Sequence, residues 1–180
     1  MRPAAPLLLA TALLMAPLGA AAAPADDLSQ HDRRQIADLA QRYLERRADK
    51  VTNVPQSSGF GIPTTDRMAA ELRNDEIKLE RRRQRWIARG GAGYSHAQVA
   101  TELKRVTVAN DGSVIAHVSE RTELYFADSH TFQHTTFGFG HVLIFNRTAA
   151  GWALATATLP PRTKCGVPPE TQFCGYSRER

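Results

Sequence analysis

Residues 106–127 read VTVANDGSVIAHVSERTELYFA, and this stretch decides the fold. In its second half, apolar side chains share one phase of a two-residue repeat: Val114, Ala116, Val118, Leu124 and Phe126. Such alternation is typical of a strand with one buried face. Asn110-Asp111-Gly112 has the composition of a hairpin turn. The stretch therefore predicts two antiparallel strands, one that ends near Ala109 and one from Ser113 to Ala127.

The same period extends the sheet in both directions. The first strand begins at about His96, and a change of phase near Lys104-Arg105 predicts a β-bulge. After a turn at Asp128-Ser129, a third strand covers about Thr131 to Arg147, with Phe137, Phe139, Leu143 and Phe145 on one face. Trp152 to Leu159 forms the last strand. These segments predict a four-stranded antiparallel meander.

Two helices are expected before the sheet. Ser29 and Asp32 resemble a capping box, and a helical stripe follows that consists of Ile36, Leu39, Ala40, Tyr43 and Leu44. This helix should end near Val51, and a loop rich in Pro, Gly and Ser follows over 53–63. Thr64 or Thr65 caps a second helix that reaches about Ala88. Its expected buried side consists of Met68, Leu72, Leu79 and Trp86.

The fold class that these elements predict is α+β. Two N-terminal helices pack on a curved four-stranded antiparallel β-meander. The domain boundaries we expect are 1–25 for a signal peptide, 26–160 for the α+β domain, and 161–180 for a Pro-rich C-terminal tail.

The signal-peptide assignment rests on the first residues. Arg2 provides a positive start, residues 4–18 are apolar, and Ala23-Pro24-Ala25 fits a small-residue cleavage site. The apolar run is too short to span a bilayer, so no transmembrane segment is expected. No cysteine lies near the junction, which argues against a lipid anchor. We therefore expect a secreted, extracellular protein.

Cys165 and Cys174 are the two cysteines of the chain. In an exported protein an even number of cysteines favours a disulfide, and this loop would contribute about 2–3 kcal/mol. Metal binding and redox work are the alternatives. They lack support because no C-x-x-C motif is present and the nearest histidine in sequence is His141.

The charge is mildly positive. The net charge of +5 includes Arg2, so a processed chain carries +4. Such an excess suits either contact with an anionic envelope polymer or simple solubility. Because the charge is scattered and the chain is exported, nucleic acid is not an expected partner. A cell-wall polymer or another secreted protein fits better.

Four arginines within five residues stand out on the second helix: Arg81, Arg82, Arg83 and Arg85. They form either an anion-binding patch or the solvated face of a helix whose last cations suit the helix dipole. Asp75, Glu76 and Glu80 lie one turn away and are placed to pair with several of them.

Candidate catalytic residues lie on the central strands and are His117, Glu120, Tyr125, His134 and His141. With a turn at residues 128–130, His117 should lie opposite His141. The two imidazoles would share a proton, bind a metal with Glu102, Glu120 or Glu123, or stand as surface histidines bonded to neighbours.

Glu120 shares its phase with apolar residues. It is either an acid or base with a raised pKa, or half of a structural pair with Arg121 or Lys104, which we favour. The chain carries no Ser/His/Asp order, phosphate loop, zinc spacing or Rossmann glycine pattern. We therefore expect no cofactor and no metal.

Three motifs carry a family resemblance, and they cover roughly residues 33–160: IADLAQRYLERRA at 36–48, VSERTELY at 118–125, and HVLIF at 141–145 followed by Gly151-Trp152. The layout resembles the cystatin-like cone, also called the nuclear-transport-factor-like fold. The motifs are similar to the N-terminal domain that precedes the amidase domain of secreted actinobacterial proteins.

The resemblance implies a curved sheet that wraps around its helices. Amidase activity belongs to the following domain of those proteins, so no catalytic residue is carried over. We expect a secreted non-catalytic module that binds a cell-envelope component or another secreted protein. The alternative is a small-molecule enzyme, of ketosteroid-isomerase-like or dehydratase type, with a pocket inside the cone.

Overall fold

The computed structural model describes residues 28–56, 58–90, 93–129, 131 and 133–158. Its elements, in chain order, are α1 (Gln30–Asp49), α2 (Asp66–Ala88), β1 (Tyr94–Val108), β2 (Val114–Phe126), β3 (His134–Thr148) and β4 (Gly151–Thr158). The predicted α+β fold, with two helices before four strands, is confirmed. The predicted signal peptide, tail and disulfide lie outside the described residues.

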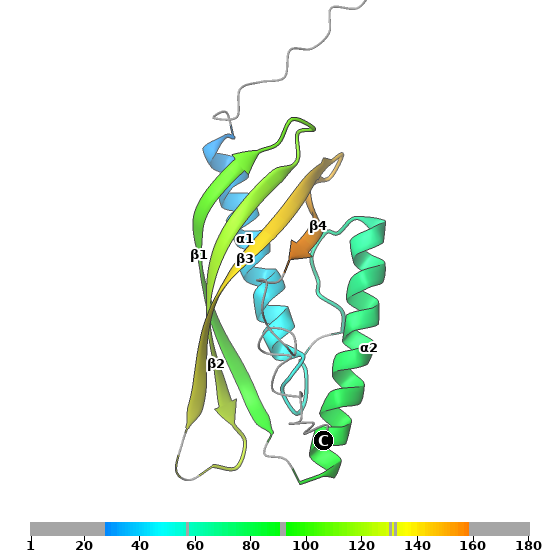
Figure 1. Ribbon diagram of the computed structural model, residues 1–180, viewed down its shortest axis with the longest axis vertical. Coiled ribbons are helices and arrows are strands. Elements are labelled where there is room, and N and C mark those ends of the chain that lie inside the picture. Colours follow the sequence, from blue (N-terminus) through cyan, green and yellow to red (C-terminus); the bar gives the residue numbers. More distant parts are fainter. Residues whose placement is uncertain (1–27, 57, 91–92, 130, 132, 159–180) are drawn as a thin grey trace, which may run out of the picture.

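The sheet is an open antiparallel meander in the order β1-β2-β3-β4. Gly112 adopts φ 79°, a left-handed conformation that favours glycine, in the predicted turn between β1 and β2. The predicted bulge is present, because the β1–β2 register shifts between Leu103 and Arg105. Figure 1 shows that the long strands twist strongly, with both helices on the same side of the sheet.

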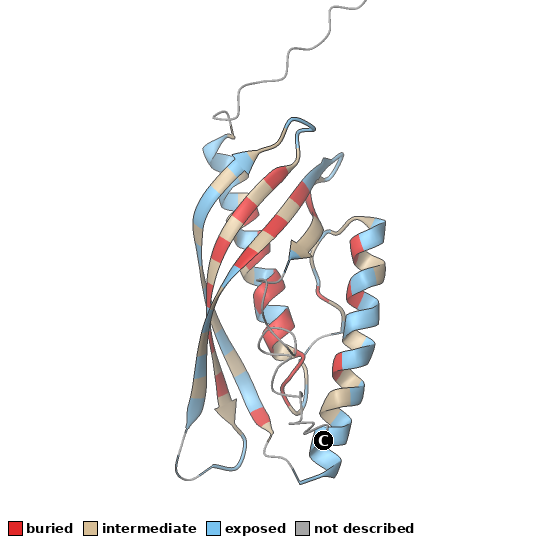
Figure 2. Cartoon of the chain, viewed as in Figure 1, coloured by how far each residue is buried: buried red, intermediate tan, exposed pale blue. Residues whose placement is uncertain are grey.

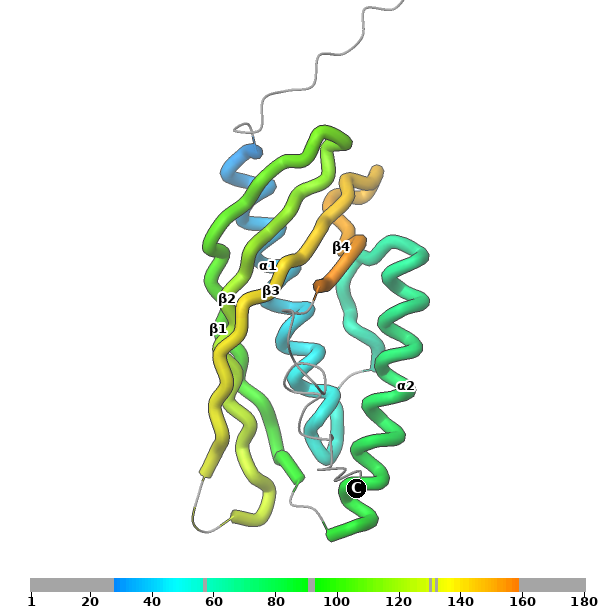
Figure 3. The backbone as a smooth tube through the Cα atoms, in the orientation of Figure 1, coloured from blue at the N-terminus to red at the C-terminus, as the bar shows by residue number. Residues whose placement is uncertain are grey.

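Helix α1 supplies the centre of the core. Ser29 caps it as predicted, because its side chain accepts from the backbone N–H of Asp32 and donates to the Asp32 carboxylate. The apolar stripe packs against the sheet, with α1 lying closest to β1, and Ile36 and Leu44 are fully buried. Burying one such side chain stabilises a fold by about 1.5–3 kcal/mol. Figure 2 shows the buried bands facing each other, and Figure 3 shows α1 between the sheet and α2.

Helix α2 forms an outer layer. Its N-cap is Thr65, and its buried side chains are Met68, Leu72 and Leu79. The prediction that Trp86 is also buried is wrong, because that residue is 36% exposed. Leu79 is the last buried residue of α2, so the helix continues for two turns beyond the hydrophobic core. It ends before Gly90, which has φ 72°.

A short parallel bridge ties the start of α2 to the outer edge of β4. The backbone N–H of Leu154 donates to Pro63 at 2.9 Å, and that of Thr65 donates to Leu154 at 3.0 Å. This contact fixes the direction in which α2 leaves the sheet. No helix in the described part of the chain is both long and apolar enough to cross a membrane.

Candidate functional site

The most concentrated group of buried ionisable side chains lies between α1 and the middle of the sheet. Nε2 of His141 on β3 donates to Oε2 of Glu120 on β2 at 2.5 Å. The hydroxyl of Thr122 donates to Oε1 of the same carboxylate, also at 2.5 Å. Nη1 of Arg47 on α1 lies 3.8 Å from Oε2. Three side chains, one each from α1, β2 and β3, therefore converge on the Glu120 carboxylate.

This cluster is sealed from solvent. Arg47 and His141 are each 3% exposed, and Glu120 is 4% exposed. Burial alone raises the pKa of Glu120, but the hydrogen bonds from His141 and Thr122 and the nearby charges hold that pKa below its ordinary value. The carboxylate is thus held ionised. An acid or base in catalysis needs the opposite, a pKa moved towards neutrality and a path to substrate.

His117 was expected to lie opposite His141, and this pairing is wrong by one residue of strand register. Val118, and not His117, lies opposite His141. A shift of one residue moves a side chain to the other face of a sheet. His117 is therefore on the outer face, where Nη2 of Arg105 donates to its Nε2 at 2.9 Å.

The expected partners of Glu120 are also wrong. Arg121 pairs with Glu123 at 3.1 Å, and Lys104 pairs with Glu102. Arg121 and Lys104 are exposed, whereas Glu120 faces inwards. The ionisable partners of Glu120 are instead Arg47 on α1 and His141 on β3.

Tyr125 and His134 lie on the outer face at the far end of the sheet. The Tyr125 ring stacks on His96 with centroids 4.3 Å apart, and His134 approaches its other side at 5.1 Å. The Tyr125 hydroxyl donates to Glu123 at 2.9 Å, which raises the pKa of Tyr125 and lowers that of Glu123. The candidates thus divide between two faces and do not form one site.

The described residues contain no group of three or more His, Cys, Asp or Glu side chains placed to hold a metal ion.

The arginine cluster of α2 is less neutralised than expected. Of the three carboxylates predicted to pair with it, Glu80 contacts Arg83, while Asp75 pairs with Lys78 and Glu76 with Lys50. Arg83 also donates to the carbonyl of Thr52 at 3.3 Å. It therefore serves as a structural link to the loop after α1.

The other arginines form a stripe along the last turns of α2. Arg81, Arg85 and Arg89 follow one another at four-residue steps, so they share one side of the helix, and Arg82 lies beside them. Within the described chain, no carboxylate forms an ion pair with any of these four. Arg89, just after the last turn, is a member that the sequence reasoning missed, although its spacing from Arg85 could have revealed it.

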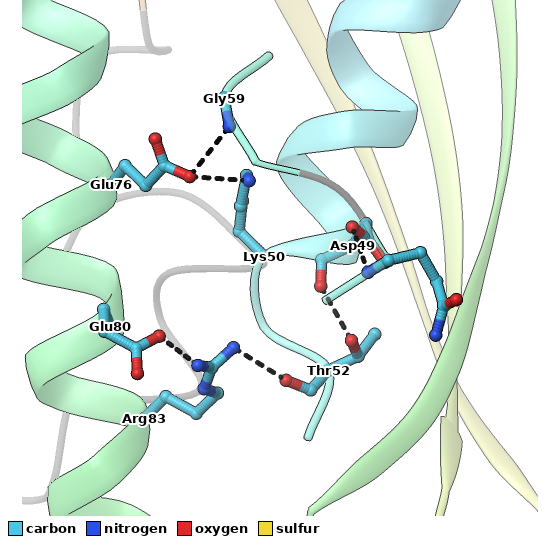
Figure 4. Close-up of polar contacts among 8 residues, drawn as sticks. Asp49, Lys50, Thr52, Gly59, Glu76, Glu80 and Arg83 are labelled. Carbon is cyan, nitrogen blue, oxygen red and sulfur yellow. Dashed lines mark hydrogen bonds and ion pairs between the residues drawn. The ribbon is translucent and has the colours of Figure 1, made fainter. Parts of the chain in front are cut away.

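A cavity of about 290 Å³ lies where the loop after α1 meets α2. Nζ of Lys50 lies 2.7 Å from the Glu76 carboxylate, and the same oxygen accepts from the backbone of Gly59 at 3.1 Å. Figure 4 shows this pair above the contact between Glu80 and Arg83. The charges that line the cavity thus pair with one another, which indicates a clamp between loop and helix.

A wider groove of about 620 Å³ follows the line between α1 and β1. Its charged walls include Arg42 and Arg46 on α1, and its floor is residues 97–99 of β1. Gln41 closes one end, because its side-chain amide donates to the carbonyl of Val99 at 2.7 Å. Neither this groove nor the smaller cavity is lined by Glu120 or His141.

Sequence reasoning missed the two buried cations, Arg47 and Lys50. The signal for Arg47 was present, because it continues the stripe of α1 three residues after Leu44. A cation on the apolar side of a helix is rarely buried without an acidic partner, so its position predicts a buried carboxylate nearby.

No protein-family model matches this sequence, and no curated protein matches it. Among solved structures, the intermembrane space region of the chloroplast protein ARC6 is similar, with a TM-score of 0.43 and 12% sequence identity. The similarity covers 69% of this chain and 93% of that chain.

Proposed function

We propose that this protein is a secreted, non-catalytic module that binds an anionic component of the cell envelope. The observation that carries the proposal is the stripe formed by Arg81, Arg82, Arg85 and Arg89. These guanidinium groups lie at the end of a helix, and the carboxylates nearby in sequence are engaged elsewhere. Repeated guanidinium groups on one side of a helix suit a polymer with repeated phosphate or carboxylate groups.

The position of the stripe also supports a partner of large size. Arg81, Arg85 and Arg89 are exposed, and α2 extends there beyond the core. An open, convex surface of this kind suits a polymer or another protein better than a small molecule, which needs a concave pocket. The signal peptide predicted over residues 1–25 and the resemblance to cystatin-like domains of secreted proteins favour the same placement outside the cytoplasm.

The enzyme alternative has less support. Its convergent groups, Glu120 and His141, are buried and already bonded to each other. A ketosteroid-isomerase-like reaction needs such groups at the wall of a substrate pocket. Here α1 covers that part of the sheet.

The test is co-sedimentation of the purified protein with isolated bacterial cell envelopes. Arg82→Gln/Arg85→Gln should keep the fold by circular dichroism and lower the bound fraction. The matched control is Arg67→Gln/Arg73→Gln, which removes the same charge from the exposed first half of α2. Binding by wild type should also fall between low salt and physiological ionic strength, where charges are screened over about 8 Å. The proposal would be contradicted if both double variants lowered the bound fraction equally, or if the bound fraction of wild type did not change with salt concentration.

A further inference from the structure

Among the residues that the structure describes, the first half of β3 is a stretch of sheet edge without a covering segment. The pairing of β3 with β4 begins at Val142 opposite Thr158 and continues to Thr148. Within the described residues, the segment 134–141 therefore has a partner strand on the β2 side alone. In Figure 1 this half of β3 lies at the lower left of the twisted sheet, with β2 and β1 drawn between it and α2.

The other edges carry recognised protective features. β1 has register shifts next to His96 and Arg105, charged side chains, and a carbonyl occupied by Gln41. The outer edge of β4 is bonded to the segment 63–65. Natural sheets use such bulges, charges and coverings to prevent pairing with other chains. Residues 134–141, HTTFGFGH, contain no Lys, Arg, Asp, Glu or Pro.

Two glycines in this segment are not required by a positive φ or by a close contact with the described residues. Neither Gly138 nor Gly140 has a positive φ. A Cβ at Gly138 would meet the backbone oxygen of Glu120 at an ordinary 3.7 Å, and one at Gly140 would meet nothing within 4 Å. Glycine weakens a strand interior and often marks close approach of another backbone. A backbone that approaches these glycines would have to come from outside the described fold.

The open segment also suits pairing with a second copy of itself around Gly138. The open segment spans residues 134–141, from the start of β3 to the point where pairing with β4 begins, and Gly138 lies next to its centre. With two copies paired antiparallel at Gly138, Phe137 of each copy lies opposite Phe139 of the other. A two-fold axis requires such reciprocal contacts, and aromatic cross-strand pairs stabilise antiparallel sheets. Because the segment carries no Lys, Arg, Asp or Glu, no fixed like charges meet at the axis.

We propose that a second copy of this chain adds to the sheet along residues 135–141 of β3, which gives a symmetric dimer with one continuous sheet. The half-buried Phe137 and Phe139 would then gain an apolar neighbour on the inner face. The proposal is independent of the arginine stripe, which lies on α2.

The test uses the oligomeric state of the full purified chain by sedimentation equilibrium over a range of concentrations. Wild type should form a dimer. Gly138→Lys places two like charges opposite each other at the axis, so it should raise the dissociation constant roughly tenfold or more. The fold should persist, because the added Cβ has room.

The matched control is Ala100→Lys. Ala100 is exposed on β1 and lies opposite Arg121, the same β2 residue that faces Gly138 from the other side. This variant should dimerise like wild type. A mixture of Gly138→Lys and Gly138→Glu chains should recover dimers, because opposite charges then meet across the axis.

A monomer at every concentration would overturn the proposal and assign the edge to residues 159–180 or to another protein. The proposal would also be overturned if Gly138→Lys left the dissociation constant of the dimer unchanged, or if Ala100→Lys raised it equally.

Discussion

Replacing Glu120 with leucine should destabilise the protein severely. The change removes a carboxylate 2.5 Å from His141 and 3.8 Å from Arg47. Arg47 is 3% exposed, so its guanidinium cannot turn to water without opening the contact between α1 and the sheet. Breaking a buried ion pair by removal of one partner costs about 3–5 kcal/mol. That is a large share of a typical total stability of about 5–15 kcal/mol.

The assay is urea unfolding followed by tryptophan fluorescence. With a slope of about 1–3 kcal/mol per molar urea, the midpoint should fall by about 2 M. Arg47→Met/Glu120→Leu/His141→Leu removes every charged group of the cluster and should regain most of the loss, because an apolar replacement often equals a buried ion pair. Glu102→Leu, an exposed site on β1, is the control and should change stability by about 0.5 kcal/mol or less. If Glu120→Leu stays within about 1 kcal/mol of wild type, or the triple variant is no better than the single one, the cluster has no stabilising role of this kind.

Three further predictions concern the pH dependence at Glu120, the contact of Asp32 with Trp152, and the two cysteines. The lowered pKa of Glu120 means that its stabilisation is present above the ordinary glutamate pKa and disappears as the pH falls through the lowered value, so the difference in unfolding free energy between wild type and Glu120→Gln should shrink in acid. Asp32→Ala removes the acceptor 2.8 Å from the indole N–H of Trp152, which should cost about 1–3 kcal/mol in urea unfolding, while Asp38→Ala, at an exposed helix pair, should cost much less. Thiol labelling of oxidised protein should detect no free Cys165 or Cys174, and two reactive thiols per chain would exclude the disulfide.

The fold followed from local signals in the sequence. The caps at Ser29 and Thr65, the turn around Gly112 and the two-residue period of the strands were all readable, because each depends on residues close together in the chain. Which side chains meet around Glu120 depended on the register between β2 and β3 and on the packing of α1, and no local sequence signal determined either of these. One residue of error placed His117 where Val118 lies, and the cation opposite Glu120 came from α1, more than seventy residues upstream. The predicted burial of Trp86 was wrong for a similar reason, because a helical stripe does not indicate where the core beneath the helix ends.

The thin attachment of α2 has a consequence for local unfolding. Its 23 residues bury three side chains, and its firm backbone contacts with β4 lie at its first turn. Segments with few buried apolar groups open at the lowest free energy, long before global unfolding. Amide hydrogens in the second half of α2 should therefore exchange sooner than those of α1 or β2, and proteases that cut after arginine should reach that half in the native state. The arginine stripe thus lies on the segment that we expect to open first, where the contacts of Glu76 with Lys50 and of Arg83 with Thr52 oppose its release from the folded α1 and sheet.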